Sequence, residues 1–358
     1  MRIAILNLPV DNNYGGNLQR YALMKVLQNM GHDVTHIDIE SKWTLPWYKK
    51  PYSYPKRFIL RYLLHRDIHI NEEFYRNRQD EKRIENVLPF YNKYIKHTKK
   101  CYSINDVINE TKDKFDAYVV GSDQVWRKSM CGSIGWRNFL LEFTKGEHVK
   151  RIAYAVSFGI DSSEYNREEY DDFKKLFSSF DSVSVRESLA LRILESMGCH
   201  AAGVSVCLDP TLLLDKFEWE DLCEGTTLLE PTKGKIFCYV LDMTEEIKVY
   251  IKRKSEELNL QVIIAGLSET TLSITEWLLS IHDAAYVITD SYHGTVFSII
   301  FEKQFHYCGN IRRGNSRIQS LFEITGIKFE DTEINWERVN YKLSHNKKVS
   351  MSFLKIMS

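Results

Sequence analysis

The stretch from residue 2 to residue 40, RIAILNLPVDNNYGGNLQRYALMKVLQNMGHDVTHIDIE, decides the fold. Its first apolar run, RIAILNL, predicts a strand, and HDVTHIDIE at the other end predicts a second one. Between them lies a polar loop at 12–16, followed by apolar residues at helical spacing from Leu18 to Leu27, and Gly31 ends the helix. This strand–helix–strand order predicts a parallel sheet of the α/β class.

The same alternation recurs along most of the chain. It returns at 115–127, and it starts again near residue 234 with a second series of strands and helices. With 358 residues the chain is long enough for two domains. We therefore predict two Rossmann-like domains that face one cleft, an N-terminal domain at 1–215 and a C-terminal domain with its tail at 216–358.

Residues 41–100 interrupt the alternation. The segment WTLPWYKKPYSYPKRFILRYLLHR places basic residues beside tryptophans and tyrosines, with few signals for strands. It predicts a helical insertion in the first domain. Aromatic and basic side chains together favour the face of an anionic membrane. The alternative is a helical excursion whose aromatic side chains pack on the first domain.

Composition narrows the class of protein. The chain has 48 Lys and Arg residues and 48 Asp and Glu residues, so its net charge gives no reason to expect a nucleic-acid partner. No run is long enough to span a bilayer, and the start MRIAILNLPV lacks a secretion signal. The 7 cysteines include no CxxC pair, which fits reduced thiols in a cytoplasmic protein and gives no zinc site.

The turn TDSYHG, residues 289–294, is the strongest candidate site. It lies between an apolar strand and a helix expected to start at about Thr295, and ligands of parallel sheets bind beyond the carboxyl ends of strands. His293 could donate a proton or bind phosphate, while Gly294 allows close approach and Ser291 and Thr295 add hydroxyl groups. The helix N-terminus favours an anion. The alternative is that Asp290 or Ser291 merely caps the helix.

Other strand ends carry further candidates. Arg186, in SVSVRES, is either a fork for carboxylate or phosphate or the partner of Glu187 or Asp181 in a salt bridge. In GSDQVWR, three polar residues either cap a helix or meet a sugar, and Asp123 is the candidate base. The candidates in GSDQVWR are Ser122, Asp123 and Gln124. The loop at the start of the first helix adds Gly15, Gly16 and Asn17, which could hold an anion. The first loop lacks a GxGxxG pattern, so a dinucleotide is not indicated.

Arginines also follow the histidine turn. IRRGNSR contains Arg312, Arg313 and Arg317, which form either a solvated face or a group that closes over a phosphate. LDPT contains Asp209, which is a second candidate base or a residue that only shapes the turn before Pro210.

Taken in order, these stretches resemble the polysaccharide pyruvyl transferase family. They are NYGGNLQRYAL, VVGSDQVW, AYAVSFG, VSVRES, LDPT, TDSYHGTVFSIIF and SRIQSLFEITGI, and the resemblance runs from residue 3 to about residue 328. It implies a GT-B-like fold of two Rossmann-like domains, with the acceptor on the N-terminal side and phosphoenolpyruvate on the C-terminal side. It also implies transfer of the pyruvyl group of phosphoenolpyruvate to two hydroxyls of a sugar.

By resemblance, the two residues that bind phosphoenolpyruvate and support catalysis fall on Arg186 and His293. A later basic residue falls on Arg317, or on Arg313 if the gap is placed differently. Many relatives have an Arg two positions before the His, where this chain has Ser291. One expected phosphate contact is therefore missing. Either Arg312, Arg313 or Arg317 supplies it, or the donor is held differently or is not phosphoenolpyruvate.

The resemblance implies no cofactor besides the donor substrate, and the residues indicate no metal. The implied acceptor is a galactose- or mannose-type sugar, in many relatives carried on a polyprenyl diphosphate lipid, which places the enzyme in surface polysaccharide (capsule or exopolysaccharide) synthesis at the cytoplasmic face of the inner membrane. Two other classes remain open: a GT-B glycosyltransferase that uses a nucleotide sugar, and a binding protein that has kept the fold and lost the chemistry.

Overall fold

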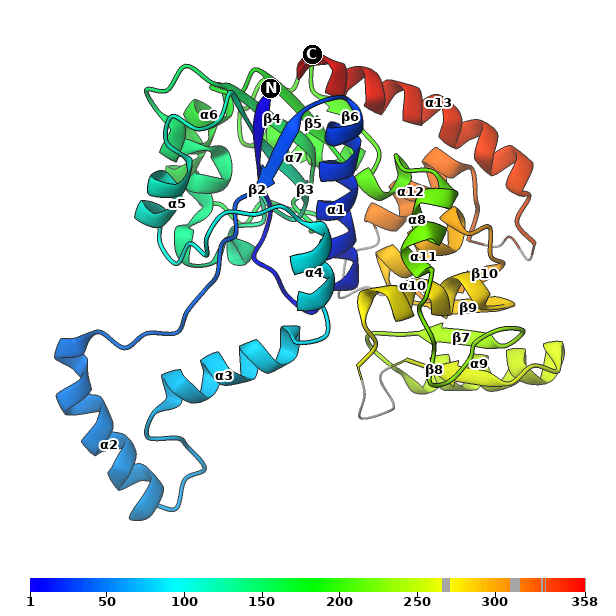
Figure 1. Ribbon diagram of the computed structural model, residues 1–358, viewed down its shortest axis with the longest axis horizontal. Helices are drawn as coiled ribbons and strands as arrows, with labels where there is room; N and C mark the ends of the chain where they lie inside the picture. The colour runs from blue at the N-terminus through cyan, green and yellow to red at the C-terminus, as the bar shows by residue number, and fades with distance from the viewer. Residues whose placement is uncertain (266–270, 310–315, 330, 332, 358) are drawn as a thin grey trace.

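The computed structural model describes residues 1–265, 271–309, 316–329, 331 and 333–357, and it contains two parallel sheets with helices on their faces (Figure 1). In the first sheet the described strands run in the order β2-β1-β3-β4-β5-β6. The prediction of an α/β fold with two Rossmann-like units is confirmed. The strands of the first sheet are β1 (Arg2–Leu6), β2 (Asp33–His36), β3 (Ala117–Asp123), β4 (Lys150–Val156), β5 (Ser182–Val185) and β6 (Ser205–Val206).

Helix α1 (Tyr14–Asn29) follows β1 and starts earlier than the sequence predicted. The side chain of Asn13 accepts a hydrogen bond from the N–H of Gly16, so Gly15 and Gly16 form the first helical turn and not a loop. The prediction failed because glycine has a low helix propensity, which the cap and the packing of α1 outweigh. The other helices around this sheet are α5 (Ile104–Thr111), α6 (Arg167–Phe177) and α7 (Ser188–Ser196).

The second sheet has the described order β10-β9-β7-β8, all parallel. The strand order reverses at β7, because β8 lies on one side of it and β9 on the other. Ligands of such sheets bind at the point where the order reverses. Its strands are β7 (Ile236–Tyr239), β8 (Val262–Ile264), β9 (Tyr286–Thr289) and β10 (Phe305–Tyr307), and its helices are α9 (Glu245–Leu258), α10 (Ile274–Asp283), α11 (Tyr292–Ile300) and α12 (Ser316–Thr325).

Two helices tie the domains together. Helix α8 (Lys216–Cys223) lies at the predicted boundary, and its buried Trp219 packs against Tyr21 of α1 and Phe297 of α11. Helix α13 (Trp336–Leu354) begins beside α12 and ends on the first sheet, where Ser350 accepts a hydrogen bond from the N–H of Leu208. The C-terminal segment therefore contacts both sheets, and the boundary at 215/216 stays a prediction.

The insertion projects away from both sheets (Figure 1). It consists of α2 (Lys50–Tyr62) and α3 (Glu72–Ile84), in which no side chain is buried, and it returns to the domain at α4 (Leu88–Tyr94). An ion pair of 2.8 Å between Arg57 and Glu73 joins the two helices. The helical prediction is confirmed, whereas the alternative that these aromatic side chains pack on the first domain is wrong.

The part of the chain that the structure describes holds no helix that is both long enough and apolar enough to cross a bilayer.

Candidate active site

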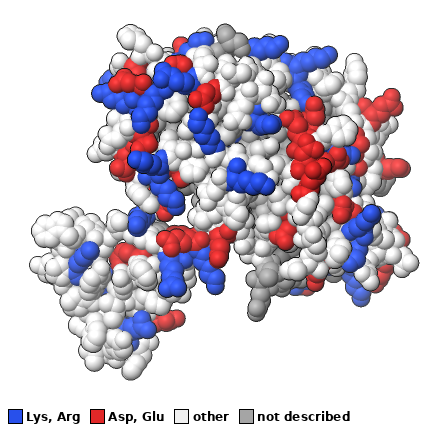
Figure 2. Space-filling view, viewed as in Figure 1, with Lys and Arg blue, Asp and Glu red and all other residues white. Residues whose placement is uncertain are grey.

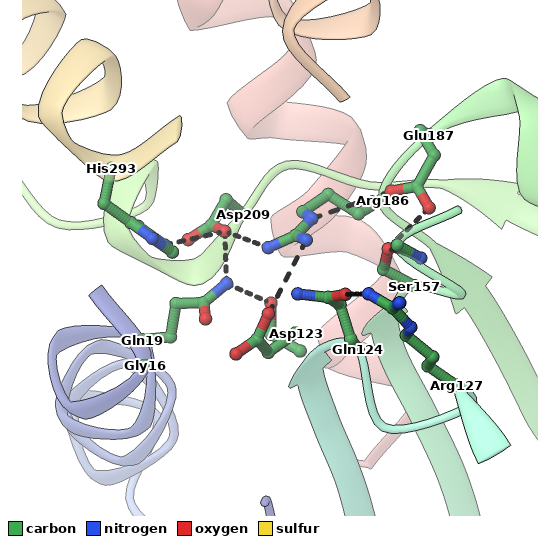
Figure 3. A network of polar contacts seen from close by, with 12 residues as sticks. Gly16, Gln19, Asp123, Gln124, Arg127, Ser157, Arg186, Glu187, Asp209 and His293 are labelled. Atoms are coloured by element: carbon green, nitrogen blue, oxygen red, sulfur yellow. Dashed lines mark hydrogen bonds and ion pairs between the residues drawn. The ribbon is translucent and has the colours of Figure 1, made fainter. Parts of the chain in front are cut away.

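The candidate site lies between the carboxyl ends of strands of the first sheet and the helix α11 that carries His293 (Figure 3). Asp123 ends β3, Arg186 follows β5, and Asp209 follows β6. Opposite them, His293 lies in the first turn of α11 after β9 of the second sheet. Residues far apart in sequence thus form one cluster because parallel strands deliver their carboxyl ends to one edge.

Asp209 is the centre of this cluster. One of its carboxylate oxygens, Oδ2, accepts a hydrogen bond of 3.0 Å from Nη1 of Arg186 and another from the amide of Gln19. The same oxygen lies 3.6 Å from Nε2 of His293. The other oxygen accepts from the hydroxyl of Thr211 at 2.7 Å, so Asp209 also shapes the turn after β6, as one interpretation of the sequence held.

The neighbours of Asp209 keep it ionised. Burial alone would raise the pKa of this carboxyl group, which is 1% exposed. The interaction with His293 and the charge of Arg186 outweigh burial, so the pKa of Asp209 lies well below its ordinary value. A carboxylate with so low a pKa is a weak base at neutral pH. Asp209 is therefore suited to holding Arg186 and His293 in position.

Arg186 is a buried cation with unused hydrogen-bonding capacity. Burial lowers its pKa, but Tyr292, Asp209 and Glu187 more than offset this and leave the pKa above its ordinary value. Within the described residues, Nε and Nη2 of Arg186 and Nε2 of His293 have no hydrogen-bond partner. Buried donors of this kind are costly unless a ligand or water pairs with them.

The salt bridge considered for Arg186 forms with Glu187 and not with Asp181. Nε of Arg186 lies 3.6 Å from Glu187, whose carboxylate accepts a hydrogen bond from Ser157. Asp181 instead accepts from the backbone N–H of Arg151. The salt bridge with Glu187 does not exclude the binding of a carboxylate or phosphate, because Nε and Nη2 of Arg186 have no hydrogen-bond partner among the described residues. Nη2 lies 3.8 Å from Asp123.

Tyr292 connects two arginines, although no role was predicted for it from the sequence. Its ring centre lies 4.7 Å from the guanidinium carbon of Arg186 and 5.7 Å from that of Arg317. Burial and the charge of Arg186 lower the pKa of Arg317. The ring of Tyr292 is thus shared by two cations, which places Arg317 beside Arg186. Arg317 therefore lies at this cluster, and its part in binding stays a prediction.

Two helix N-termini meet at His293. A Cβ atom added to Gly15 in the first turn of α1 would lie 1.9 Å from Nδ1 of His293, so only glycine allows this contact. One added to Gly16 would lie 3.6 Å from Oδ2 of Asp123. The N-terminal turns of α1 and α11 both border the cluster, and their N–H groups favour a negative charge there.

Asp123 sits on a strained backbone. Its φ is 70° and that of Ser122 is 25°, values that residues other than glycine rarely adopt. Ser122 accepts a hydrogen bond from Gln19 at 2.9 Å, and Gln124 accepts one from Arg127 at 3.0 Å. No α-helix starts here in the described chain, so the expectation that these residues cap a helix is wrong.

The remaining candidates make local contacts. Ser291 caps α11 by accepting from the N–H of Gly294, so the helix starts at Tyr292 and not at Thr295. Thr295 donates its hydroxyl to the carbonyl of Ser291. Asn17 donates to the carbonyls of Asp11 and Asn13. These contacts fix the shape of the site, and direct binding of a substrate by these residues stays a prediction.

Asp290, the alternative cap, does not cap α11. Its carboxylate accepts from the N–H groups of Leu241 and Asp242 and so fastens the turn after β7 to the turn after β9. Arg312 and Arg313 lie outside the described residues.

Gln19, Glu187 and Tyr292 were not predicted as site residues. Gln19 is 1% exposed in the middle of α1, and a polar residue on an otherwise apolar helical face was the signal available for it. Glu187 and Tyr292 directly adjoin predicted residues, but their orientation depends on folded geometry. No group of three or more potential metal ligands occurs among the described residues.

The sequence profile of the family described as polysaccharide pyruvyl transferase matches residues 13–311, which include Arg186, Asp209 and His293. The chain belongs to the polysaccharide pyruvyl transferase family. Membership in this family implies that the protein is a transferase and that its acceptor is a sugar. A search of curated proteins found no match.

One similar solved structure supports the fold of this pyruvyl transferase family member. A UDP-GlcNAc 2-epimerase from Neisseria meningitidis bound to UDP-GlcNAc has a TM-score of 0.50 at 9% identity, covering 98% of this chain and 94% of that one. A putative UDP-N-acetylglucosamine 2-epimerase from Listeria monocytogenes has a TM-score of 0.49 at 11% identity, with 98% and 90% covered. At these identities the likeness concerns the fold alone, which is of the GT-B type.

We predict that Gly15→Ala lowers transferase activity at least about tenfold, because its Cβ would displace His293 or push the domains apart. Gly16→Ala should lose much less, since its Cβ would meet no atom closer than 3.5 Å. The loss of activity is measured as initial rates of both variants, after their melting temperatures have been shown to match that of wild type. Equal activities of the two variants would contradict the contact between Gly15 and His293.

We predict that Asp209→Asn lowers the free energy of unfolding at pH 7 by about 3 kcal/mol or more, because Arg186 loses its buried partner. A carboxylate with a lowered pKa stabilises the fold above the ordinary Asp pKa of about 4, and this contribution falls as pH drops further. The difference between wild type and variant should therefore narrow below about pH 4. Urea unfolding across this pH range measures the stability of wild type, Asp209→Asn and the control Asp221→Asn, which changes an exposed residue. The account would be contradicted if Asp209→Asn were as stable as wild type, as the control should be.

Proposed function

We propose that this enzyme transfers the pyruvyl group of phosphoenolpyruvate to two hydroxyls of one sugar and forms a pyruvate ketal. The observation that carries the proposal is the cluster of Arg186, Arg317 and His293 with two helix N-termini around buried, unpartnered donors of Arg186 and His293. Phosphoenolpyruvate carries a phosphate and a carboxylate, which are the groups that such donors bind. Family membership supports the same reaction class.

The reaction balances without a redox step. Protonation of the methylene carbon of phosphoenolpyruvate makes C2 electrophilic, and the first sugar hydroxyl adds there. Phosphate leaves with the bonding electrons of the C2–O bond, and the second hydroxyl adds to C2 and closes the ketal. Of the two hydroxyl protons, one replaces the proton given to the methylene carbon and the other leaves with phosphate. We propose that no cofactor is needed.

The geometry suggests a division of roles. Arg186 and Arg317, held on the ring of Tyr292, bind the donor anion, and Arg317 takes the place of the arginine that this chain lacks at Ser291. His293 donates a proton or holds the phosphate. Asp123 serves as base for a hydroxyl, since the lowered pKa of Asp209 makes Asp209 a weak base at neutral pH. Asp209 positions Arg186 and His293.

The donor must reach side chains that are almost fully covered. Arg186 is 3% exposed and His293 is 6% exposed, and they come from different domains. We propose that the domains separate to admit phosphoenolpyruvate and close around it, as hinge-bending enzymes do. The acceptor would enter from the N-terminal domain and be a galactose- or mannose-type sugar, in free or lipid-linked form.

We predict that wild type releases phosphate from phosphoenolpyruvate only when an acceptor sugar is present, and that His293→Ala lowers this rate at least about a hundredfold. Phosphate release is measured with galactose, mannose and glucosamine derivatives, free and lipid-linked. His200→Ala, at an exposed histidine of the first domain, is the control and should keep wild-type rates. Equal rates for His293→Ala and wild type would remove His293 from the mechanism.

A ligand screen separates the donor from the alternatives. Stabilisation by phosphoenolpyruvate supports the proposal, whereas stabilisation by nucleotide sugars alone would favour a glycosyltransferase. Binding of phosphoenolpyruvate without turnover of any acceptor would favour a non-catalytic relative.

A further inference from the structure

The outward face of α2 is an apolar stripe on which no described residue packs closely. Tyr52, Phe58, Ile59, Tyr62 and Leu63 recur at the spacing of one helical face, and their exposed fractions are 80%, 51%, 48%, 54% and 68%. The opposite face, which includes Arg57 and Leu60, is partly covered. Soluble proteins rarely leave a contiguous apolar patch of this kind open unless a partner covers it.

The turn before α2 extends the stripe. Trp47 is 80% exposed and Tyr48 is 57% exposed in the 3-10 helix at Trp47–Lys49. Figure 2 shows this projection as a mostly uncharged surface with a few separate basic and acidic side chains. Tryptophan and tyrosine are the side chains that prefer the boundary between lipid and water, because one end is apolar and the other polar.

The charge of this segment has one sign. Residues 41–66 contain seven Lys and Arg residues and no Asp or Glu, in a chain whose two kinds of charge are equal in number. Lys56 borders the apolar stripe, whereas Lys50 and Arg61 lie nearer the face of Arg57. These three basic residues form no ion pair with a described residue. Two copies of this surface placed face to face would bring like charges together. An anionic surface, in contrast, complements the segment in both charge and apolar character.

We propose that α2 and the turn before it form a membrane-docking surface, which lies in the interface of an anionic lipid bilayer with the stripe of Tyr52, Phe58, Ile59, Tyr62 and Leu63 inserted. The basic residues contact lipid phosphates, and the two-helix projection carries the catalytic domains clear of the bilayer (Figure 1). The inference rests on this surface alone and holds whether or not the donor is phosphoenolpyruvate.

Vesicle co-sedimentation tests the proposal. Wild type should bind phosphatidylcholine vesicles that contain phosphatidylglycerol and should bind pure phosphatidylcholine vesicles far less. Ile59→Asn with Leu63→Asn should weaken binding at least about tenfold. The control, Val249→Asn with Tyr341→Asn, replaces apolar residues that are 68% and 79% exposed on other helices, and it should bind like wild type.

Charge is tested separately. Lys50→Gln with Lys56→Gln should weaken binding by about 25-fold, because each cation near an anionic surface contributes about fivefold. Lys252→Gln with Lys348→Gln, on exposed parts of α9 and α13, should change nothing. All these side chains are exposed, so melting temperatures should match that of wild type.

Three results would overturn the proposal. The first is equal binding of wild type to both kinds of vesicle, or binding to neither. The second is unchanged binding of the Ile59 and Leu63 variant. The third is a wild-type dimer without lipid, seen by sedimentation, that the same variant dissociates, because the stripe would then cover a second copy.

Discussion

The buried ion pair between Arg186 and Asp209 is the interaction on which the rest of the site depends. Asp209 also holds Gln19 of α1 and faces His293 of α11, so one carboxylate links elements of both sheets. Removing Asp209 would leave Arg186 with only the longer contacts to Glu187 and Asp123, and removing Arg186 would leave the carboxylate of Asp209 buried without its cation. Either loss costs more than the pair itself contributes. The pair therefore makes the geometry of the site and the closed arrangement of the domains depend on each other.

The sequence predicted the parts of the fold and site that follow from local pattern. Strand–helix alternation gave both sheets, and polar residues at strand ends gave Arg186, Asp123 and His293. The starts of α1 and α11 were placed too late, because Asn13 and Ser291 cap these helices several residues before the apolar spacing becomes visible. Capping competes with glycine propensity, and only the folded packing decides between them.

The central role of Asp209 and the contributions of Gln19 and Tyr292 were beyond prediction from pattern. Each depends on which residues from distant strands and helices lie opposite one another, and a single sequence does not specify this. The insertion is the reverse case. Its composition was visible in the sequence, but the choice between packing on the domain and facing outward required the observed exposure of α2.

The most direct test of the central claim is a calorimetric titration of phosphoenolpyruvate into wild type, Arg186→Gln and Arg317→Gln. The account predicts saturable binding to wild type, weakened at least about tenfold in each variant, since each loses a charge-assisted contact to the anion. Variants with wild-type melting temperatures and unchanged affinity would contradict it, and so would a wild type that binds nucleotide sugars but not phosphoenolpyruvate.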